Sequence, residues 1–266
     1  MSFADETALT PTETGVWEGT LAEGWNTPRG PLGGYVMAIV MRGLELAVDD
    51  AARQARSVTM HFLRVPEAGP VTVRAAVERA GGSLSTVSGR LEQDGKLLGL
   101  ALAAYSKPFE SPLLDQTPMP EVQPAEAPEP ASAAPGAPTP EFLKRMVFQH
   151  RFGDFPFTQS ERAEVGGWVG LYGEEGPLDA GMVALLADAW FPAPWPRLRE
   201  LAPAPTVDLT VHFRSPLPVE APLLLGRFDC KLTRDGFFDE NGELWAPDGT
   251  LVAQSRQLGL LLGAEV

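Results

Sequence analysis

The sequence predicts an α+β protein made of two related units in tandem, each with an apolar helix covered by an antiparallel sheet. Three observations support this: markers that recur in the same order, an apolar helical segment in each half, and alternating strands after each helix. A proline-rich segment separates the halves. We therefore expect one unit at residues 1–107, a linker at 108–140 and a second unit at 141–266.

A recurring strand motif is the clearest sign of duplication. Residues 57–62 read SVTMHF, and residues 208–213 read DLTVHF. Trp17 and Trp168 are separated by the same number of residues as these two motifs, and each is followed two residues later by glycine. An Asp-Gly turn follows in each half. Several markers in one order favour duplication over chance.

The helices and strands of each unit follow from hydrophobic patterning. Residues 33–47 and 178–191 are helical segments that are apolar almost all round, so each must be covered on most sides. Residues 206–214 alternate, which predicts a strand with one buried face. Its apolar side chains are Val207, Leu209, Val211 and Phe213. We expect each sheet to wrap around its helix.

The linker has its own composition. Residues 108–140 contain ten of the 26 prolines, mixed with alanine and glutamate. Proline removes backbone donors and favours extended polyproline geometry. This segment is therefore predicted to be a semi-rigid tether without a core of its own.

Composition excludes several classes of function and partner. The formal net charge of -14 opposes binding to nucleic acid through a basic surface. The single cysteine, Cys230, excludes an intramolecular disulfide and fits a reducing compartment. The N-terminus lacks a signal-peptide pattern, and no stretch approaches the ~18–20 apolar residues of a bilayer span. We expect a cytoplasmic protein with no nucleic-acid or membrane partner.

Common hydrolytic and metal motifs are missing from the sequence. It contains no Gly-x-Ser-x-Gly elbow and no metal-ligand spacing of His, Asp and Glu. His61 and His212 occupy equivalent places in the two units, which favours a structural role, and His150 has no partner motif. We therefore expect neither a metal nor a cofactor.

Asp188 is the only charge well inside the second apolar helix. Pro192 is expected to end that helix, which places the carboxylate near the C-terminus, where the helix dipole and burial both disfavour it. Small residues such as Gly181 share its face and leave room for a ligand. The alternative is that Asp188 caps a loop or pairs with Arg197 or Arg199.

Two polar residues of the second unit are further candidates. Gln257 lies in the last strand on a face of small residues, where the first unit has Ala103. Such an amide has a partner, whether structural or functional. Thr206 opens the alternating strand, and alternation places it opposite the apolar face unless Pro205 distorts the strand entry.

At these residues the chain resembles the acyl-CoA thioesterase II family, whose members are tandem double hot-dog proteins that hydrolyse acyl-CoA. The resemblance runs from about Gly15 to Leu262, apart from the linker. The family's helix Asp, strand-head Thr and final Gln are matched by Asp188 in ALLADAW, Thr206 in TVDLTVHF and Gln257 in RQLG.

Two further positions bear on the resemblance. Leu258 departs from the family, whose members commonly carry Glu there. Gly33-Gly34-Tyr35 is similar to the family's start of the first helix, where close approach of substrate and helix-start packing are equally good explanations.

The resemblance implies a pseudo-dimeric double hot-dog and a site in its second unit. Asp188, Thr206 and Gln257 would hold a water that attacks the thioester, with Asp188 as the proton acceptor. The amides of Gly33-Gly34 or of Gly181 would stabilise the oxyanion. The expected substrate-binding residues are Gly33, Gly34, Tyr35 and Gly181. The candidates for the CoA phosphates are Arg29, Arg64 and Arg214.

Two other functions stay open on the sequence. One is a protein that binds acyl-CoA without cleaving it, and the other is a hot-dog hydratase or dehydratase acting on enoyl thioesters. A homodimer of the whole chain is a further expectation by analogy.

Overall fold

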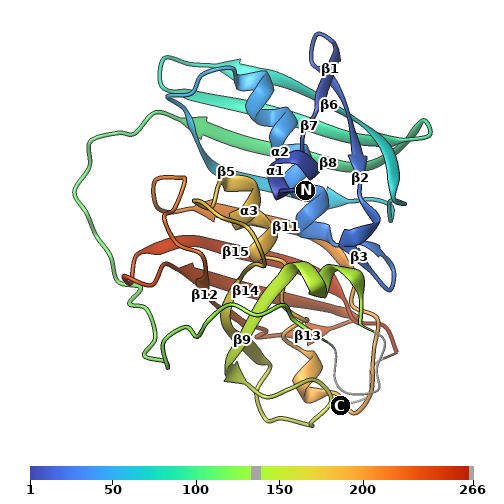
Figure 1. Cartoon of the computed structure of the whole chain (residues 1–266), viewed down its shortest axis with the longest axis vertical. Helices are drawn as coiled ribbons and strands as arrows, with labels where there is room; N and C mark the ends of the chain where they lie inside the picture. The colour runs from blue at the N-terminus through green and yellow to red at the C-terminus, as the bar shows by residue number, and fades with distance from the viewer. Residues whose placement is uncertain (133–138, 264–266) are drawn as a thin grey trace.

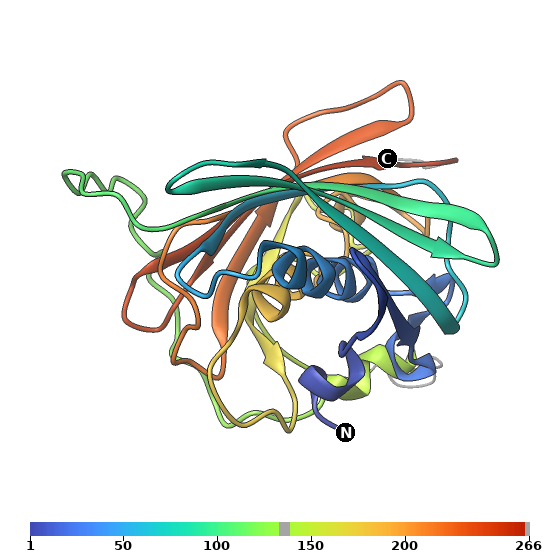
Figure 2. The same cartoon turned by 90° about the horizontal axis from the view of Figure 1, so that it is seen from above.

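The computed structural model of the chain describes residues 1–132 and 139–263. Within these residues the main element is one antiparallel sheet of 13 strands. The sheet curves over two helices that lie against its inner face (Figures 1 and 2). None of the described helices is long and apolar enough to cross a membrane.

The first half places one long helix before four long strands. Its leading elements are α1 (Phe3–Glu6), β1 (Thr10–Glu13), β2 (Val16–Leu21), η1 (Glu23–Trp25), β3 (Asn26–Thr27) and β4 (Gly30–Pro31). The helix and its strands are α2 (Gly33–Val48), β5 (Gln54–Phe62), β6 (Gly69–Ala80), β7 (Leu84–Gln93) and β8 (Lys96–Ser106).

The second half has the same general order with a shorter helix. Its first elements are η2 (Glu141–Arg145), β9 (Met146–Gly153), β10 (Glu164–Leu171), α3 (Ala180–Leu186) and η3 (Trp195–Arg197). The remaining strands are β11 (Thr206–Phe213), β12 (Leu224–Asp229), β13 (Thr233–Arg234), β14 (Phe237–Trp245) and β15 (Leu251–Leu260).

The strand order is mirrored about the centre of the sheet. From the central β5–β11 pair outward, the first half runs β8, β7, β6, β2, and the second runs β15, β14, β12, β10. The two repeated motifs therefore meet: Val58 pairs with Val211, and the hydroxyls of Thr59 and Thr210 lie 2.8 Å apart. The recurring sequence markers thus fall on equivalent strands.

Helix α3 is shorter than the sequence predicts. The expected helix over residues 178–191 begins at Ala180, where the Asp179 side chain caps it, and ends at Leu186. Asp188 therefore lies in a turn just after the helix, with its N–H donating to Leu185 O at 3.1 Å. The prediction that Asp188 is helical is wrong, because its N–H bonds to the carbonyl three residues back and the α-helical bonding has ended before it.

The linker is extended and held against the second half. Residues 108–132 contain no helix or strand, and residues 133–138 lie outside the described part of the chain. Trp168 Nε1 donates to Gln123 O at 2.9 Å, and Trp245 Nε1 donates to Thr117 O at 3.1 Å. These bonds fix the segment along the sheet. The domain boundaries given above stay a prediction.

Candidate active site

Asp188 joins the two halves of the molecule. Its Oδ2 accepts a hydrogen bond from the backbone N–H of Gly34 at 2.6 Å. Gly34 is the second residue of α2, and Leu32 at the N-cap makes no side-chain capping bond. The carboxylate from the second half therefore satisfies a free amide of the first-half helix and lies at the positive end of its dipole.

The two glycines that begin α2 make this contact possible. A Cβ atom on Gly34 would lie 2.8 Å from the Cα of Leu185, and one on Gly33 would lie 2.8 Å from Asp188 Oδ2. Any larger residue would push the two helices apart. The Gly-Gly pair is thus required for the close approach of α2 and the Asp188 turn.

The Asp188 carboxyl group is poised to exchange a proton near neutral pH. Burial raises its pKa from 3.8 to about 7, and the Gly34 hydrogen bond partly opposes that rise. No basic side chain in the described residues forms an ion pair with it, and Arg197 and Arg199 are exposed. Asp188 itself keeps some solvent exposure. A carboxyl group that is partly exposed and has a raised pKa suits the role of a general base.

Thr206 and Gln257 contact each other on the inner face of the sheet. Gln257 Nε2 lies 2.5 Å from Thr206 Oγ1. The register of β11 against β15 shifts between Thr206, which pairs with Gly259, and Asp208, which pairs with Leu258. The shift means that β11 has one extra residue between these two pairs, which puts Thr206 on the inner face of the sheet. The prediction from alternation, which placed Thr206 on the other face, is therefore wrong.

Glu240 also belongs to this region, and the sequence reasoning missed it. It lies directly opposite Gln257 in the β14–β15 pair, it is 8% exposed, and its Oε2 accepts from Ala193 N at 2.6 Å. Burial, with a contribution from the charge of Asp188, raises its pKa to about 8. The sequence signal for Glu240 was its place in the alternation of β14, where it lies on the same inward face as Phe238.

Tyr35 and Gly181 have packing roles in the structure. Tyr35 is fully buried, its hydroxyl donates to Glu6 O at 3.0 Å, and its ring stacks on Trp25 with centroids 4.9 Å apart. Gly181 lies at the other end of α3, where a Cβ atom would be 3.4 Å from Ala38 Cβ. The expectation that these two residues bind substrate gains no support from these contacts.

Comparison with known families identifies the chain. A model of the acyl-CoA thioesterase N-terminal domain matches residues 21–106, and one of the C-terminal domain matches residues 121–261, more than half of the chain. The chain belongs to the acyl-CoA thioesterase family. As a member of it, the protein is a thioester hydrolase. A search of curated proteins finds no match.

Solved structures agree with this assignment. A conserved protein of unknown function with a hot-dog fold from Alicyclobacillus acidocaldarius is 26% identical, has a TM-score of 0.87 and is matched over 99% of this chain and 98% of its own. A protein assigned as thioesterase II from Thermobifida fusca is 26% identical, with a TM-score of 0.83 and 98% of both chains covered. The acyl-CoA thioesterase II TesB2 from Mycobacterium marinum shares the fold at 18% identity, with a TM-score of 0.75 and both chains fully covered.

Proposed function

We propose that this thioesterase consists of two tandem hot-dog units that together form one hydrolytic site, built by Asp188, Thr206 and Gln257. Its reaction is the hydrolysis of an acyl-CoA thioester to a carboxylic acid and CoA. The observation that carries the proposal is the hydrogen bond of 2.6 Å between Asp188 and the N-terminus of α2. It places a carboxyl group with a pKa of about 7 beside backbone amides.

The mechanism uses a water molecule as the nucleophile. Thr206 and Gln257 orient the water, and Asp188 takes one of its protons as the oxygen attacks the thioester carbonyl carbon. The carbonyl oxygen becomes an oxyanion, which is stabilised by the dipole at the α2 N-terminus and by its amides other than that of Gly34, which is bonded to Asp188. The carbon–sulfur bond then breaks, and the proton held by Asp188 passes to the departing thiolate.

The first half lacks the polar groups needed for a second site. The position of Thr206 opposite Gly259 is matched by Ala55 opposite Tyr105 in the β5–β8 pair. The position of Gln257 is matched by Ala103, which is buried. The two halves share their strand order, but only the second has polar side chains at these positions, which supports a single hydrolytic site per chain.

Arg29 is one candidate for binding the CoA phosphates. It lines a cavity of about 390 Å³ that also includes Pro31, just before the start of α2. Arg64, in contrast, donates to Leu97 O at 2.6 Å. Glu67 also lines the cavity, and its negative charge would disfavour a phosphate placed beside it.

Release of CoA thiol from short, medium, long and aromatic acyl-CoAs tests this function directly. We expect saturable release with at least one acyl class. Saturable binding without release would indicate an acyl-CoA-binding protein instead. Hydration of an enoyl-CoA without thiol release would indicate a hydratase. Either of these outcomes would overturn the proposal.

A further inference from the structure

Glu240 is a buried carboxyl group that the hydrolytic mechanism does not use. Its strand register and one hydrogen bond connect it to the site. It lies opposite Gln257 across the β14–β15 pair, so both side chains are on the inner face of the sheet. Its Oε2 also accepts from the N–H of Ala193 at 2.6 Å, on the segment that follows Asp188. Glu240 thus links the sheet beside Gln257 to the segment that follows Asp188.

The mirrored half shows that a carboxyl group is not required by the fold at this place. The β7–β8 pair corresponds to β14–β15, and in it Val87 lies opposite Ala103, both buried. Where the first half has this apolar pair, the second has Glu240 opposite Gln257. Two polar residues therefore replace two apolar ones together, and only in the half that contains the site.

We propose that Glu240 is a positioning residue of the hydrolytic site, which holds the segment after Asp188 through Ala193 and supports the side chain of Gln257. This inference rests on the proposed hydrolysis. Without the carboxyl group, Ala193 in the segment after Asp188 loses its bond to the sheet, and Gln257 loses its polar neighbour. Small displacements of this kind lower the rate of a water-mediated attack because the reacting atoms must be aligned.

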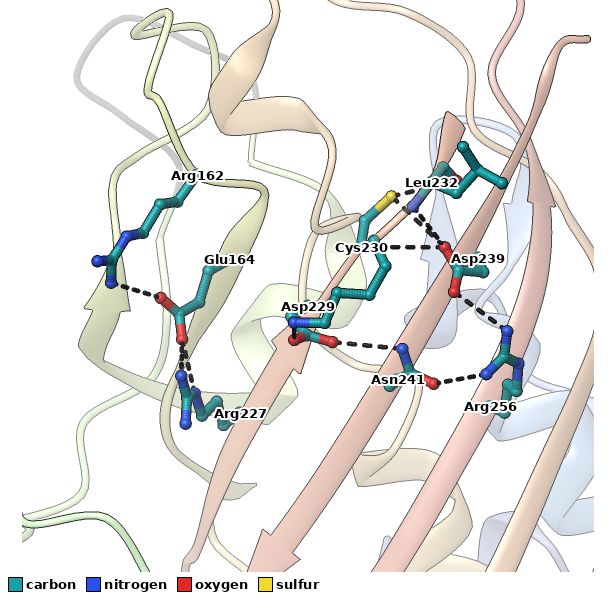
Figure 3. Close-up of polar contacts among 10 residues, drawn as sticks. Arg162, Glu164, Arg227, Asp229, Cys230, Leu232, Asp239, Asn241 and Arg256 are labelled. Atoms are coloured by element: carbon teal, nitrogen blue, oxygen red, sulfur yellow. Dashed lines mark hydrogen bonds and ion pairs between the residues drawn. The ribbon is translucent and has the colours of Figure 1, made fainter. Parts of the chain in front are cut away.

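The charges around Glu240 have their own partners. Asp229 pairs with Lys231 and accepts from Asn241 at 3.3 Å, and Asp239 pairs with Arg256 at 3.2 Å (Figure 3). The other neighbours are the neutral amide of Gln257 and the Cys230 thiol, whose pKa is raised by burial. This leaves Asp188, on the segment that follows α3, as the acidic neighbour without a counterion in the described residues.

Coupling between the two carboxyl groups gives Glu240 a second measurable effect. Burial raises the pKa of Glu240 to about 8, and the charge of Asp188 adds to that rise, so ionised Asp188 favours the protonated form of Glu240. Above pH 8, Glu240 also ionises and places a second negative charge beside a reaction that develops an oxyanion. We therefore expect kcat to rise through pH 7 and to fall above pH 8.

Three variants test the role of Glu240. Glu240→Val introduces the residue of the mirrored position, and Glu240→Gln keeps an oxygen acceptor for Ala193 but cannot ionise. Glu243→Val makes the same change on the outer face of β14, where Glu243 accepts from Gln254 at 3.3 Å. All three are compared with wild type for kcat, KM and the pH dependence of kcat in the thiol-release assay.

We expect Glu240→Val to lower kcat at least about tenfold with KM within about threefold, and Glu240→Gln to keep kcat within about threefold. Glu243→Val should match wild type, and Glu240→Gln should lose the fall in kcat above pH 8. Wild-type kcat in Glu240→Val, or an unchanged alkaline fall in Glu240→Gln, would overturn the inference alone. If Glu240→Val does not fold, the pH profile of Glu240→Gln decides. Absence of thiol release by wild type would overturn the proposed function and this inference with it.

Discussion

Replacing Asp188 with asparagine should stabilise the protein at alkaline pH. In the folded state burial raises the pKa of Asp188 from 3.8 to about 7. A group whose pKa rises on folding contributes stability below its unfolded pKa and loses that contribution as pH rises through the folded pKa. At about 1.36 kcal/mol per pKa unit, the ionised carboxylate lowers wild-type stability by at most about 4 kcal/mol above pH 7.

Asparagine keeps an oxygen that can accept from Gly34 N and carries no charge at any pH. We therefore expect the stability advantage of Asp188→Asn over wild type to grow by about 2–4 kcal/mol between pH 4 and pH 8. Urea unfolding of both proteins at pH 4, 6 and 8 measures this difference. Parallel stability curves for the two proteins would refute the reasoning, because they would mean that Asp188 ionises in the folded state as freely as in the unfolded state.

Three further predictions concern other residues of the proposed site and its surroundings. Thr206→Val and Gln257→Ala should each lower kcat by about 10–100-fold. Because both side chains orient one water, the double variant should lose little more activity than the worse single variant. Steady-state kinetics tests this, and losses that multiply in the double variant would contradict it. Gly34→Ala should lower the free energy of unfolding by about 1–3 kcal/mol because its Cβ would meet the backbone of α3, whereas Gly82→Ala, with nothing within 4 Å, should change it little in the same urea assay. Arg29→Ala should raise KM for acyl-CoA about tenfold with kcat unchanged, and an unchanged KM would remove Arg29 from the binding site.

The correspondence between strands of the two halves follows from the repeated motifs. The recurring His-Phe strand and the Trp-x-Gly strand occupy equivalent positions in the two halves, so their order along the chain predicted which strands correspond. Gln257 was recognised because it replaces an alanine on a small-residue face. In the structure its amide contacts Thr206, as a buried polar group requires.

Features that depend on contacts between distant segments could not be read from the sequence. The extra residue beside Thr206 is defined only by the register against β15, and a single strand's alternation carries no information about its partner. Likewise, just after the early end of helix α3, the bonds of Asp188 to Gly34 and of Ala193 to Glu240 join segments that are far apart in the sequence. Glu240 was visible as an inward glutamate, but only once β14 had been placed opposite Gln257.

The central claim is that one carboxyl group, Asp188, acts as the base in acyl-CoA hydrolysis. The most direct test is CoA thiol release by wild type and by Asp188→Asn, measured side by side at pH 8 with the best acyl-CoA of the panel. Loss of a positioned general base is expected to lower kcat by about 10²–10⁴-fold, with circular dichroism showing that the variant is folded. Equal rates from wild type and the folded variant would contradict the account and place the catalytic base elsewhere.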